Sequence, residues 1–246
     1  MHCVILAGGL GKRMLPLTEC MPKNLLPVLG VPFAAWQLSW LVGQGVTDVL
    51  YCVAHMGDQI RSYVNDGSRW KLRVRYADEG PELMGTAGAL RAAHRAALLP
   101  ERFLLLYGDS YLPVPFRPVW DRFVRAASPA LMTVFRNEGR WDTSNVAYED
   151  DRLLVYDKFR THPLTPRMRH IDYGLSALHR SVIEHLVPTQ GPSDLATVFH
   201  QLSLAKQLAG YEVAERFYEV GSPQGLDDLE LYLKTTQEAA AAPAAV

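Results

Sequence analysis

A cluster of glycines and cations near the start of the chain has the composition of a phosphate site. It follows an apolar run, Cys3 to Ala7, that is long enough for one buried strand of a parallel sheet. Glycine has no Cβ, so backbone N–H groups can approach a bulky ligand, while arginine grips phosphate with a planar fork and lysine acts as a point charge. The residues concerned are Gly8, Gly9, Gly11, Lys12, Arg13 and Lys23. They predict an anion site at the end of the first strand.

The spacing of these residues excludes two common phosphate loops. A Walker loop needs G-x-x-x-x-G-K-[ST], and a dinucleotide fingerprint needs G-x-G-x-x-G that opens into a helix. Here the glycines lead into Pro16-Leu17-Thr18 and then Pro22-Lys23, with apolar residues after them. The predicted anion site is therefore of another kind.

The segment from Leu6 to Val28 reads LAGGLGKRMLPLTECMPKNLLPV. It resembles the signature of the sugar-1-phosphate nucleotidyltransferases, LAGGxGxRLxPLT followed by PKPLLPV, with Asn24 in place of the proline after the lysine. The resemblance implies an NTP and a sugar 1-phosphate as substrates, Mg²⁺ as cofactor, and catalytic roles for Arg13, Lys23 and Asp109. It also implies nucleotide contacts from Leu6, Ala7, Gly8, Gly9, Gly11, Lys12 and Arg13.

Two further segments are expected to hold the nucleotide. Gly85 and Thr86 begin an Ala/Leu-rich stretch that predicts a helix capped by Thr86, and the similar family segment holds the base and ribose. Glu79 could accept a hydrogen bond from an exocyclic amine of the base, or it could be a solvated loop acid.

Two metal ligands are expected, the first of them directly after a strand. Asp109 follows the apolar strand predicted over 102–107, at the strand end where ligands collect in an open α/β sheet. Mg²⁺ takes one or two carboxylates together with phosphate oxygens and water, so Asp109 is the first candidate ligand. Glu219 stands where the family has a second metal-binding aspartate.

The sugar side of the predicted site is assigned by the resemblance. Lys158 matches the family lysine that contacts the sugar-linked phosphate, and Asp172 and Gly174 stand where the family's N-A-G lines the sugar pocket. Asn145 is a further candidate, and Lys23 would also contact this phosphate. As alternatives, Asn145, Lys158 and Asp172 could be polar strand residues with a structural role.

The periodicity of the sequence predicts alternating strands and helices, hence a mostly parallel sheet with right-handed crossovers. Strands are expected over 3–7, 49–53, 72–76, 102–107 and 131–135, and helices over 32–44, 56–64, 86–98, 115–127 and 193–208. Extended pieces over 144–149, 153–159 and 170–178 are expected to form a small, partly antiparallel sugar-binding lid. The fold class is thus α/β, a Rossmann-like sheet flanked by helices.

One nucleotidyltransferase domain is expected over residues 1–238. Within it, a nucleotide half covers about 1–136, a sugar-binding part about 137–220 and a closing helix 222–238, with Ser222 as its cap and Pro223 at its first position. The Ala/Pro-rich residues 239–246 are expected to be a disordered tail.

Composition limits the partners and the compartment. The chain has 246 residues with 25 basic and 26 acidic side chains, so no general attraction to nucleic acid or membrane is expected. Three cysteines without a C-x-x-C pair indicate a reducing compartment, and without a signal peptide or apolar span we expect a cytoplasmic protein. A monomer or small homo-oligomer is expected.

The reaction that the resemblance implies is transfer of a nucleoside monophosphate from an NTP to a sugar 1-phosphate. Within the family, Tyr107-Gly108-Asp109-Ser110, Asn145 and Asp172-Tyr173-Gly174 are most like the short D-glycero-D-manno-heptose 1-phosphate guanylyltransferases. This favours GTP and a heptose or related higher sugar. The alternatives are a uridylyl or thymidylyl transferase acting on a hexose 1-phosphate, and a nucleotide-binding regulatory module with weak catalysis, which Asn24 and Glu219 would favour.

Overall fold

The computed structural model describes residues 1–80 and 82–241. The strands are β1 (His2–Leu6), β2 (Pro27–Val28), β3 (Val31–Pro32), β4 (Asp48–Val53), β5 (Arg73–Asp78), β6 (Arg102–Tyr107), β7 (Ser110–Tyr111), β8 (Ala130–Arg136), β9 (Val146–Glu149), β10 (Arg152–Tyr156), β11 (His170–His179), β12 (Leu208–Val213) and β13 (Tyr218–Glu219). The helices are α1 (Phe33–Gly43), α2 (Gly57–Val64), α3 (Gly85–Arg95), α4 (Phe116–Arg125), α5 (Arg180–Leu186), α6 (Leu195–Leu204) and α7 (Pro223–Ala241), with 3-10 turns η1 (Lys12–Met14), η2 (Lys23–Leu25), η3 (Ser68–Trp70) and η4 (Thr165–Arg167).

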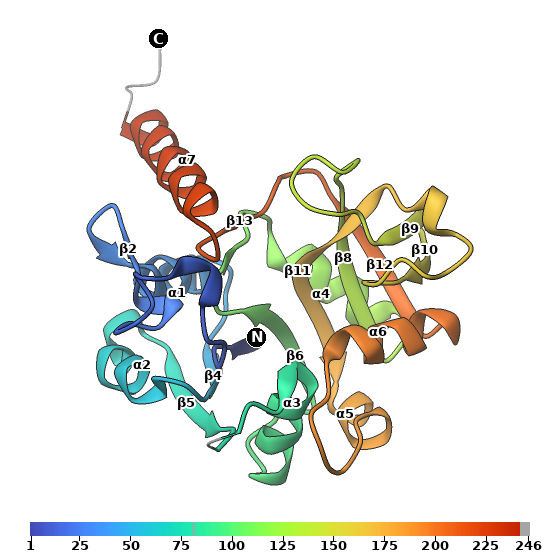
Figure 1. The fold of residues 1–246 in the computed structure, drawn as a ribbon, viewed down its shortest axis with the longest axis horizontal. Coiled ribbons are helices and arrows are strands. Elements are labelled where there is room, and N and C mark those ends of the chain that lie inside the picture. The colour runs from blue at the N-terminus through green and yellow to red at the C-terminus, as the bar shows by residue number, and fades with distance from the viewer. Residues whose placement is uncertain (81, 242–246) are drawn as a thin grey trace.

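One mixed sheet runs through the protein in the order β5-β4-β1-β6-β11-β8-β12, with the β9–β10 hairpin joined to the start of β11 (Figure 1). β1 pairs in parallel with both β4 and β6, and β12 pairs in parallel with β8. β11 is antiparallel to its neighbours β6 and β8. The sheet is therefore mostly parallel, as the alternation of elements predicts.

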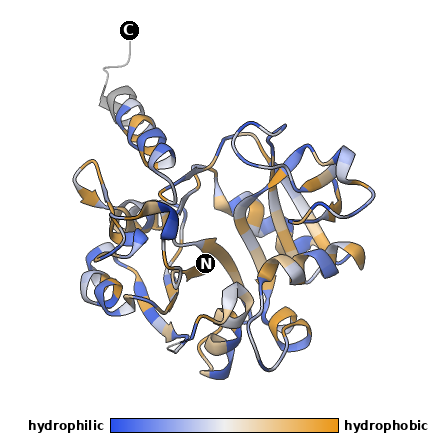
Figure 2. Ribbon diagram, viewed as in Figure 1, coloured by the Kyte–Doolittle hydropathy of each residue, from blue (hydrophilic) through white to orange (hydrophobic). Residues whose placement is uncertain are grey.

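Both faces of the sheet are buried, which explains the continuous apolar runs of its central strands. In β1, Cys3 and Ile5 pack on the side covered by α1, α2 and α4, while Val4 and Leu6 pack on the side covered by α3, α5 and α6. Figure 2 shows hydrophobic residues along these strands and mixed character along the helices. The sheet is thus a rigid support whose strand ends can hold functional loops.

Several elements were not expected from the sequence, the longest of them β12 and α5. The helix predicted over 193–208 ends at Leu204, and Leu208–Val213 forms the edge strand β12 beside β8. The short run LAGYEV shows little strand periodicity, so its conformation comes from pairing with β8 rather than from local preference. Helix α5, directly after β11, was also absent from the prediction.

The antiparallel strands predicted for the lid are present, but one of them, β11, lies in the main sheet. β11, expected in the lid, is a central strand between β6 and β8, and the β9–β10 hairpin is antiparallel beside it. β8, expected in the nucleotide half, lies on the far side of β11. Sequence order does not predict these long-range pairings, because β11 returns to the sheet between two strands that precede it in the chain.

The closing helix α7 starts as expected and extends further. The Ser222 hydroxyl accepts a hydrogen bond from the N–H of Gly225 at 3.1 Å, which is an N-cap with Pro223 at the first position. The helix continues to Ala241, so residues 239–241 are helical rather than part of a tail, while 242–246 lie outside the described residues. Across residues 1–80 and 82–241, no helix is both long and apolar enough to span a membrane.

Candidate active site

The first loop of the site and the loop that carries Asp109 lie at the same edge of the sheet. Leu6 and Tyr107 are paired at the carboxyl ends of the parallel neighbours β1 and β6. The glycine loop therefore begins beside the segment Gly108-Asp109, as expected for ligand sites in open α/β sheets. Two hollows open here, of about 240 Å³ and 890 Å³, and both are lined by Tyr107 and Asp109.

The smaller hollow collects most of the residues that the sequence assigns to the nucleotide. It is lined by Leu6, Ala7, Gly8, Gly9, Lys23, Glu79, Gly85, Thr86 and Asp109, together with Asn24, Leu83, Ala89, Tyr107 and Gly108. These residues come from β1 and the glycine loop after it, η2, the loop after β5, the start of α3 and the end of β6. The fold thus brings five separate segments of the chain to one apolar-walled pocket.

The larger cavity collects the residues assigned to the sugar phosphate and the metal. Among the predicted residues, its lining includes Arg13, Asp109, Lys158, Asp172, Gly174 and Glu219. Gly11, Lys12 and Asn145 line neither hollow. Gly11 instead adopts a left-handed backbone conformation, and its carbonyl accepts a hydrogen bond from Thr18 that closes the loop.

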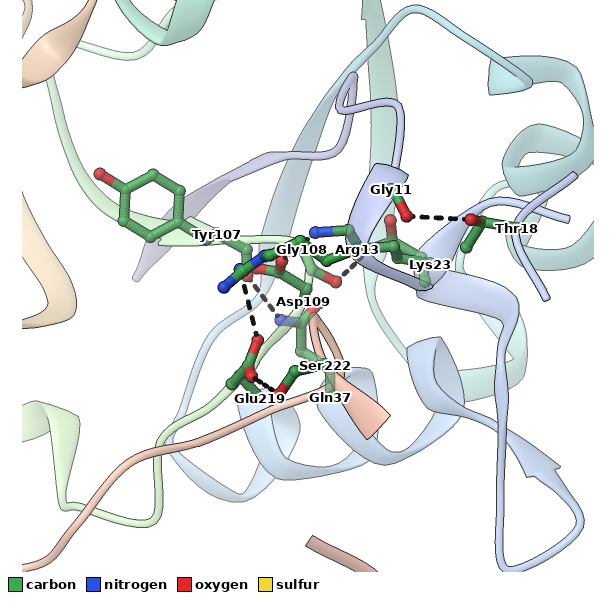
Figure 3. A network of polar contacts seen from close by, with 11 residues as sticks. Gly11, Arg13, Thr18, Lys23, Gln37, Tyr107, Gly108, Asp109, Glu219 and Ser222 are labelled. Carbon is green, nitrogen blue, oxygen red and sulfur yellow. Dashed lines mark hydrogen bonds and ion pairs between the residues drawn. The ribbon is translucent and has the colours of Figure 1, made fainter. Parts of the chain in front are cut away.

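Charged groups gather where the two hollows meet (Figure 3). The Lys23 ammonium pairs with the Asp109 carboxylate at 2.8 Å, and the Arg13 guanidinium lies 3.8 Å from Glu219. β13 pairs with β7 so that Glu219 lies opposite Ser110, and the Val220 N–H donates to the Asp109 carbonyl at 2.9 Å. This small two-stranded ladder brings the two carboxylates together, although they are far apart in the sequence.

Gly221 leaves room for the carboxylates of Asp109 and Glu219 to approach each other. A Cβ at this position would lie within 3.2 Å of carboxylate oxygens of both Asp109 and Glu219, and 3.0 Å from the Arg13 guanidinium. Any side chain here would displace these groups. The two carboxylates face the same small space beside Gly221. Carboxylates are hard oxygen ligands, which Mg²⁺ binds together with phosphate oxygens and water. Asp109 and Glu219 therefore fit the cofactor that the sequence resemblance implies.

Glu79 lies against the glycine loop. A Cβ on Gly8 would collide with its carboxylate, and the side chain lines the smaller hollow. Burial, aided by the neighbouring charge of Asp78, raises the pKa of Glu79 from 4.5 to about 7. The group is therefore an acceptor that changes protonation near neutral pH.

Thr86 and Lys158 share a partner that the sequence analysis missed. The Asp194 carboxylate accepts hydrogen bonds from the Thr86 hydroxyl at 3.0 Å and from the N–H of Ala196 at 2.9 Å, and it pairs with Lys158 at 3.3 Å. Asp194 thus caps α6 and links Thr86, which lines the smaller hollow, to Lys158, which lines the larger. The signal was available, since an aspartate just before an apolar helix is a common N-cap.

The predicted cap of α3 is wrong. Thr86 lies inside the helix, and its hydroxyl is bonded to Asp194 and the N–H of Leu195. Among the residues that the structure describes, no side chain caps α3. The N–H groups of Ala87 and Gly88 donate to the Ser193 carbonyl, at 3.0 and 3.2 Å. This end of α3 is therefore occupied by the segment that leads into α6, which a local sequence pattern could not reveal.

Asp172 is held in a bulge of β11. Its pairing with β8 shifts between Asp172 and Ser176, and Gly174 takes a φ of 99° and donates its N–H to the Asp172 carboxylate at 3.0 Å. The side chain of Asn145 accepts a hydrogen bond from the N–H of Asp172 at 3.0 Å, so Asn145 supports this bulge from outside the cavity. Burial raises the pKa of Asp172 from 3.8 to about 6 despite that N–H donor and Lys158.

Arg216 also lines the larger cavity and was not predicted. Its guanidinium lies 3.6 Å from the ring centre of Trp141 and pairs with Asp228 at 2.9 Å. These contacts connect the loop after β8 to the start of α7. No motif marks Arg216, since stacking and ion pairing between distant segments appear only in three dimensions.

The family model for nucleotidyl transferases matches residues 2–226. This chain belongs to the nucleotidyl transferase family. It is 36% identical over 116 residues to an N-acetylmuramate alpha-1-phosphate uridylyltransferase from Neisseria meningitidis serogroup B, a match that covers 47% of this chain and 50% of the relative. It is 24% identical over 226 residues to a D-glycero-alpha-D-manno-heptose 1-phosphate guanylyltransferase from Aneurinibacillus thermoaerophilus, covering 91% and 94% of the two chains.

Solved structures share the fold of this nucleotidyl transferase. HddC from Yersinia pseudotuberculosis, complexed with GMP-PN, superposes with a TM-score of 0.74 at 21% identity, covering 94% of this chain and 99% of HddC. For the first curated relatives, the match spans about half of the relative's length or less. Family and fold are therefore established, and the choice of substrates is a separate question.

Proposed function

We propose that this nucleotidyl transferase moves a nucleoside monophosphate from an NTP to a sugar 1-phosphate and releases pyrophosphate. GTP is the favoured donor, and a heptose 1-phosphate or related higher sugar phosphate is the favoured acceptor. The observation that carries the proposal is the charged cluster of Lys23, Asp109, Glu219 and Arg13 at the junction of the two hollows. A nucleotide in one hollow and a sugar in the other would bring their phosphates to this junction.

The chemistry requires positioning and cations rather than a base. A phosphate monoester has its second pKa near ~6, so the attacking oxygen of the sugar 1-phosphate is largely ionised at neutral pH. The protein must bring two polyanions together and stabilise the charge that grows on the α-phosphate and the leaving pyrophosphate. Mg²⁺ bound to Asp109 and Glu219 would supply Lewis-acid stabilisation of that charge.

The cations of the chain would act at different points of the reaction. Lys23, anchored on Asp109, can neutralise the α-phosphate, and Arg13 faces the same junction from η1. Lys158 borders the larger cavity from the other side and can hold the sugar-linked phosphate once it leaves Asp194. The two reacting phosphates would thus be held from opposite walls of the cleft, which favours in-line attack.

The preference for GTP rests on the smaller hollow. Guanine presents N1–H and an exocyclic amine as donors, and both the Glu79 carboxylate and backbone carbonyls between Leu6 and Gly9 can act as acceptors there. The heptose 1-phosphate guanylyltransferase that aligns with nearly the whole chain supports the same choice of base. In the larger cavity, Asp172 is placed to bind sugar hydroxyls.

A uridylyl transferase is the second candidate. The Neisseria relative, a uridylyltransferase, is more similar to this chain over its matched half than the guanylyltransferase is over nearly its whole length. Both candidates use the same charged junction and differ in the base pocket and in the sugar.

A pyrophosphate-release assay with four NTPs and a panel of sugar 1-phosphates tests the proposal. We expect release to require Mg²⁺ and to be fastest with GTP and a heptose 1-phosphate. A preference for UTP or dTTP would replace the guanylyl assignment with the second candidate. No release with any pair would favour a nucleotide-binding regulatory module and would refute the proposed activity.

We also propose a cytoplasmic protein that acts as a monomer or small homo-oligomer. Cys3, Cys20 and Cys52 are free thiols, and a reducing compartment would keep the exposed Cys20 in that state.

A further inference from the structure

Gln37 is a polar side chain in the core-facing stripe of α1. It is 2% exposed, and its helix neighbours Ala34, Leu38 and Leu41 belong to the apolar core. A buried amide at such a position is costly unless its hydrogen bonds serve a purpose. Its partners indicate what that purpose is.

The amide nitrogen of Gln37 donates to two carbonyls that flank Asp109. It lies 3.1 Å from the Tyr107 oxygen and 2.9 Å from the Ser110 oxygen, and Figure 3 shows Gln37 beneath this loop. Two acceptors fix the orientation of the amide, because the flipped group would place its oxygen against both carbonyls. One side chain thus connects the residue before Gly108-Asp109 with the residue after it.

Those carbonyls lie at the two ends of the turn between β6 and β7, which carries Gly108 and Asp109. Each consecutive carbonyl from Tyr107 to Ser110 accepts a hydrogen bond. The Gln37 amide donates to the first and the last, the Asn24 amide donates to Gly108, and the Val220 N–H donates to Asp109. The turn between β6 and β7 is therefore held at every residue. Its rigidity determines where the Asp109 carboxylate points.

The oxygen of the Gln37 amide indicates that this side chain does more than stabilise the fold. Within the described part of the chain, its Oε1 atom is buried and has no hydrogen-bond partner. A methionine of similar size would fill the same space without that unpaired acceptor. A glutamine at this position is therefore explained by the two hydrogen bonds that its amide nitrogen donates to the Asp109 loop.

We propose that Gln37 is a positioning residue that fixes the Asp109 loop and thereby sets the affinity of the site for a divalent cation. The proposal deepens the proposed function and rests on it for the part that the cation plays in catalysis. Gln37 itself touches neither substrate nor metal in this scheme. It acts through the backbone of Tyr107 and Ser110.

The test compares Gln37→Met with Gln44→Met, a matched control at the end of the same helix. Gln44 also bonds backbone, but its partner is the N–H of Phe116 at the start of α4. Three measurements are made on both variants and the wild type: hydrogen exchange of the peptide covering 103–112, binding of Mn²⁺ followed by EPR, and the Mg²⁺ dependence of pyrophosphate release. If Gln37→Met does not fold, Gln37→Asn, one methylene shorter, replaces it.

For Gln37→Met we expect faster exchange in 103–112, Mn²⁺ affinity lower by about ten-fold, and a matching rise in the Mg²⁺ concentration needed for activity. The KM for the sugar phosphate and the melting temperature should change little, and Gln44→Met should change none of the three measurements. Unchanged exchange and Mn²⁺ affinity in Gln37→Met would overturn the inference. If the wild type releases no pyrophosphate, the proposed function fails, while exchange and Mn²⁺ binding still decide the role of Gln37.

Discussion

Replacing Glu79 with glutamine should stabilise the protein in a manner that depends on pH. Burial raises the pKa of Glu79 from 4.5 to about 7, so the folded protein holds a proton that the unfolded chain releases. A raised carboxyl pKa means that stability is complete below about pH 4.5 and is lost as the pH rises to about 7. Above that range the wild type bears the full cost of the buried charge, and glutamine, which has the same shape, removes it.

The size of the effect follows from the shift. A change from 4.5 to about 7 corresponds to at most about 3 kcal/mol, and partial exposure of the side chain reduces this to about 2 kcal/mol. For a chain of this length, we expect Glu79→Gln to raise Tm by about 4–8 °C at pH 8 and by about a quarter of that at pH 5. Differential scanning calorimetry at both pH values measures it.

Glu82→Gln is the matched control, because Glu82 is an exposed acid in the same loop. It should leave Tm within about 1 °C of the wild type at both pH values. An equal gain for Glu79→Gln at pH 5 and pH 8, or no gain at either, would show that Glu79 is not a buried carboxylate of raised pKa.

The same titration predicts a change in base selectivity. The ionised Glu79 can accept hydrogen bonds from guanine, and a charge-assisted bond of this kind contributes about 1.5–3 kcal/mol, or roughly ten- to a hundred-fold in selectivity. The ratio of kcat/KM for GTP to that for ATP should therefore rise between pH 6 and pH 8 and be smaller and flat in Glu79→Gln. Using the ratio cancels the titration of the phosphates, which both nucleotides share. A pH-independent preference for GTP that survives the substitution would place the discrimination in backbone carbonyls.

Four substitutions probe the charged junction. Lys23→Ala should lower kcat/KM by about 10² or more, because the lysine neutralises charge that grows in the transition state, and unchanged steady-state kinetics would contradict its assignment. Asp109→Asn should raise the Mg²⁺ requirement more than Glu219→Gln does, and metal titrations with the opposite order would reverse the ranking of the two ligands. Gly221→Ala should reduce the rate by at least about ten-fold at saturating Mg²⁺ in the pyrophosphate assay, since its methyl would enter the space between the two carboxylates. A fully active Gly221→Ala would show that the two carboxylates need not converge.

The sequence by itself predicted the parallel half of the fold and the placement of the glycine loop and Asp109 at one edge of the sheet. Apolar runs such as Cys3 to Ala7 indicate buried strands, because a strand with both faces covered must be apolar throughout. Glycines, cations and an acid placed directly after such strands then share one edge of the sheet. Short-range patterns were sufficient there, since each residue's position follows from the strand that precedes it.

Tertiary structure alone decided which distant groups meet. The place of β11 between β6 and β8, the meeting of Glu219 with Asp109, and the bonds of Asp194 to Thr86 and Lys158 all join segments that are far apart along the chain. β12 likewise forms because β8 offers it an open edge. Local preferences cannot specify such contacts, because the free energy of these contacts comes from strand pairing and burial that exist only once the sheet has formed.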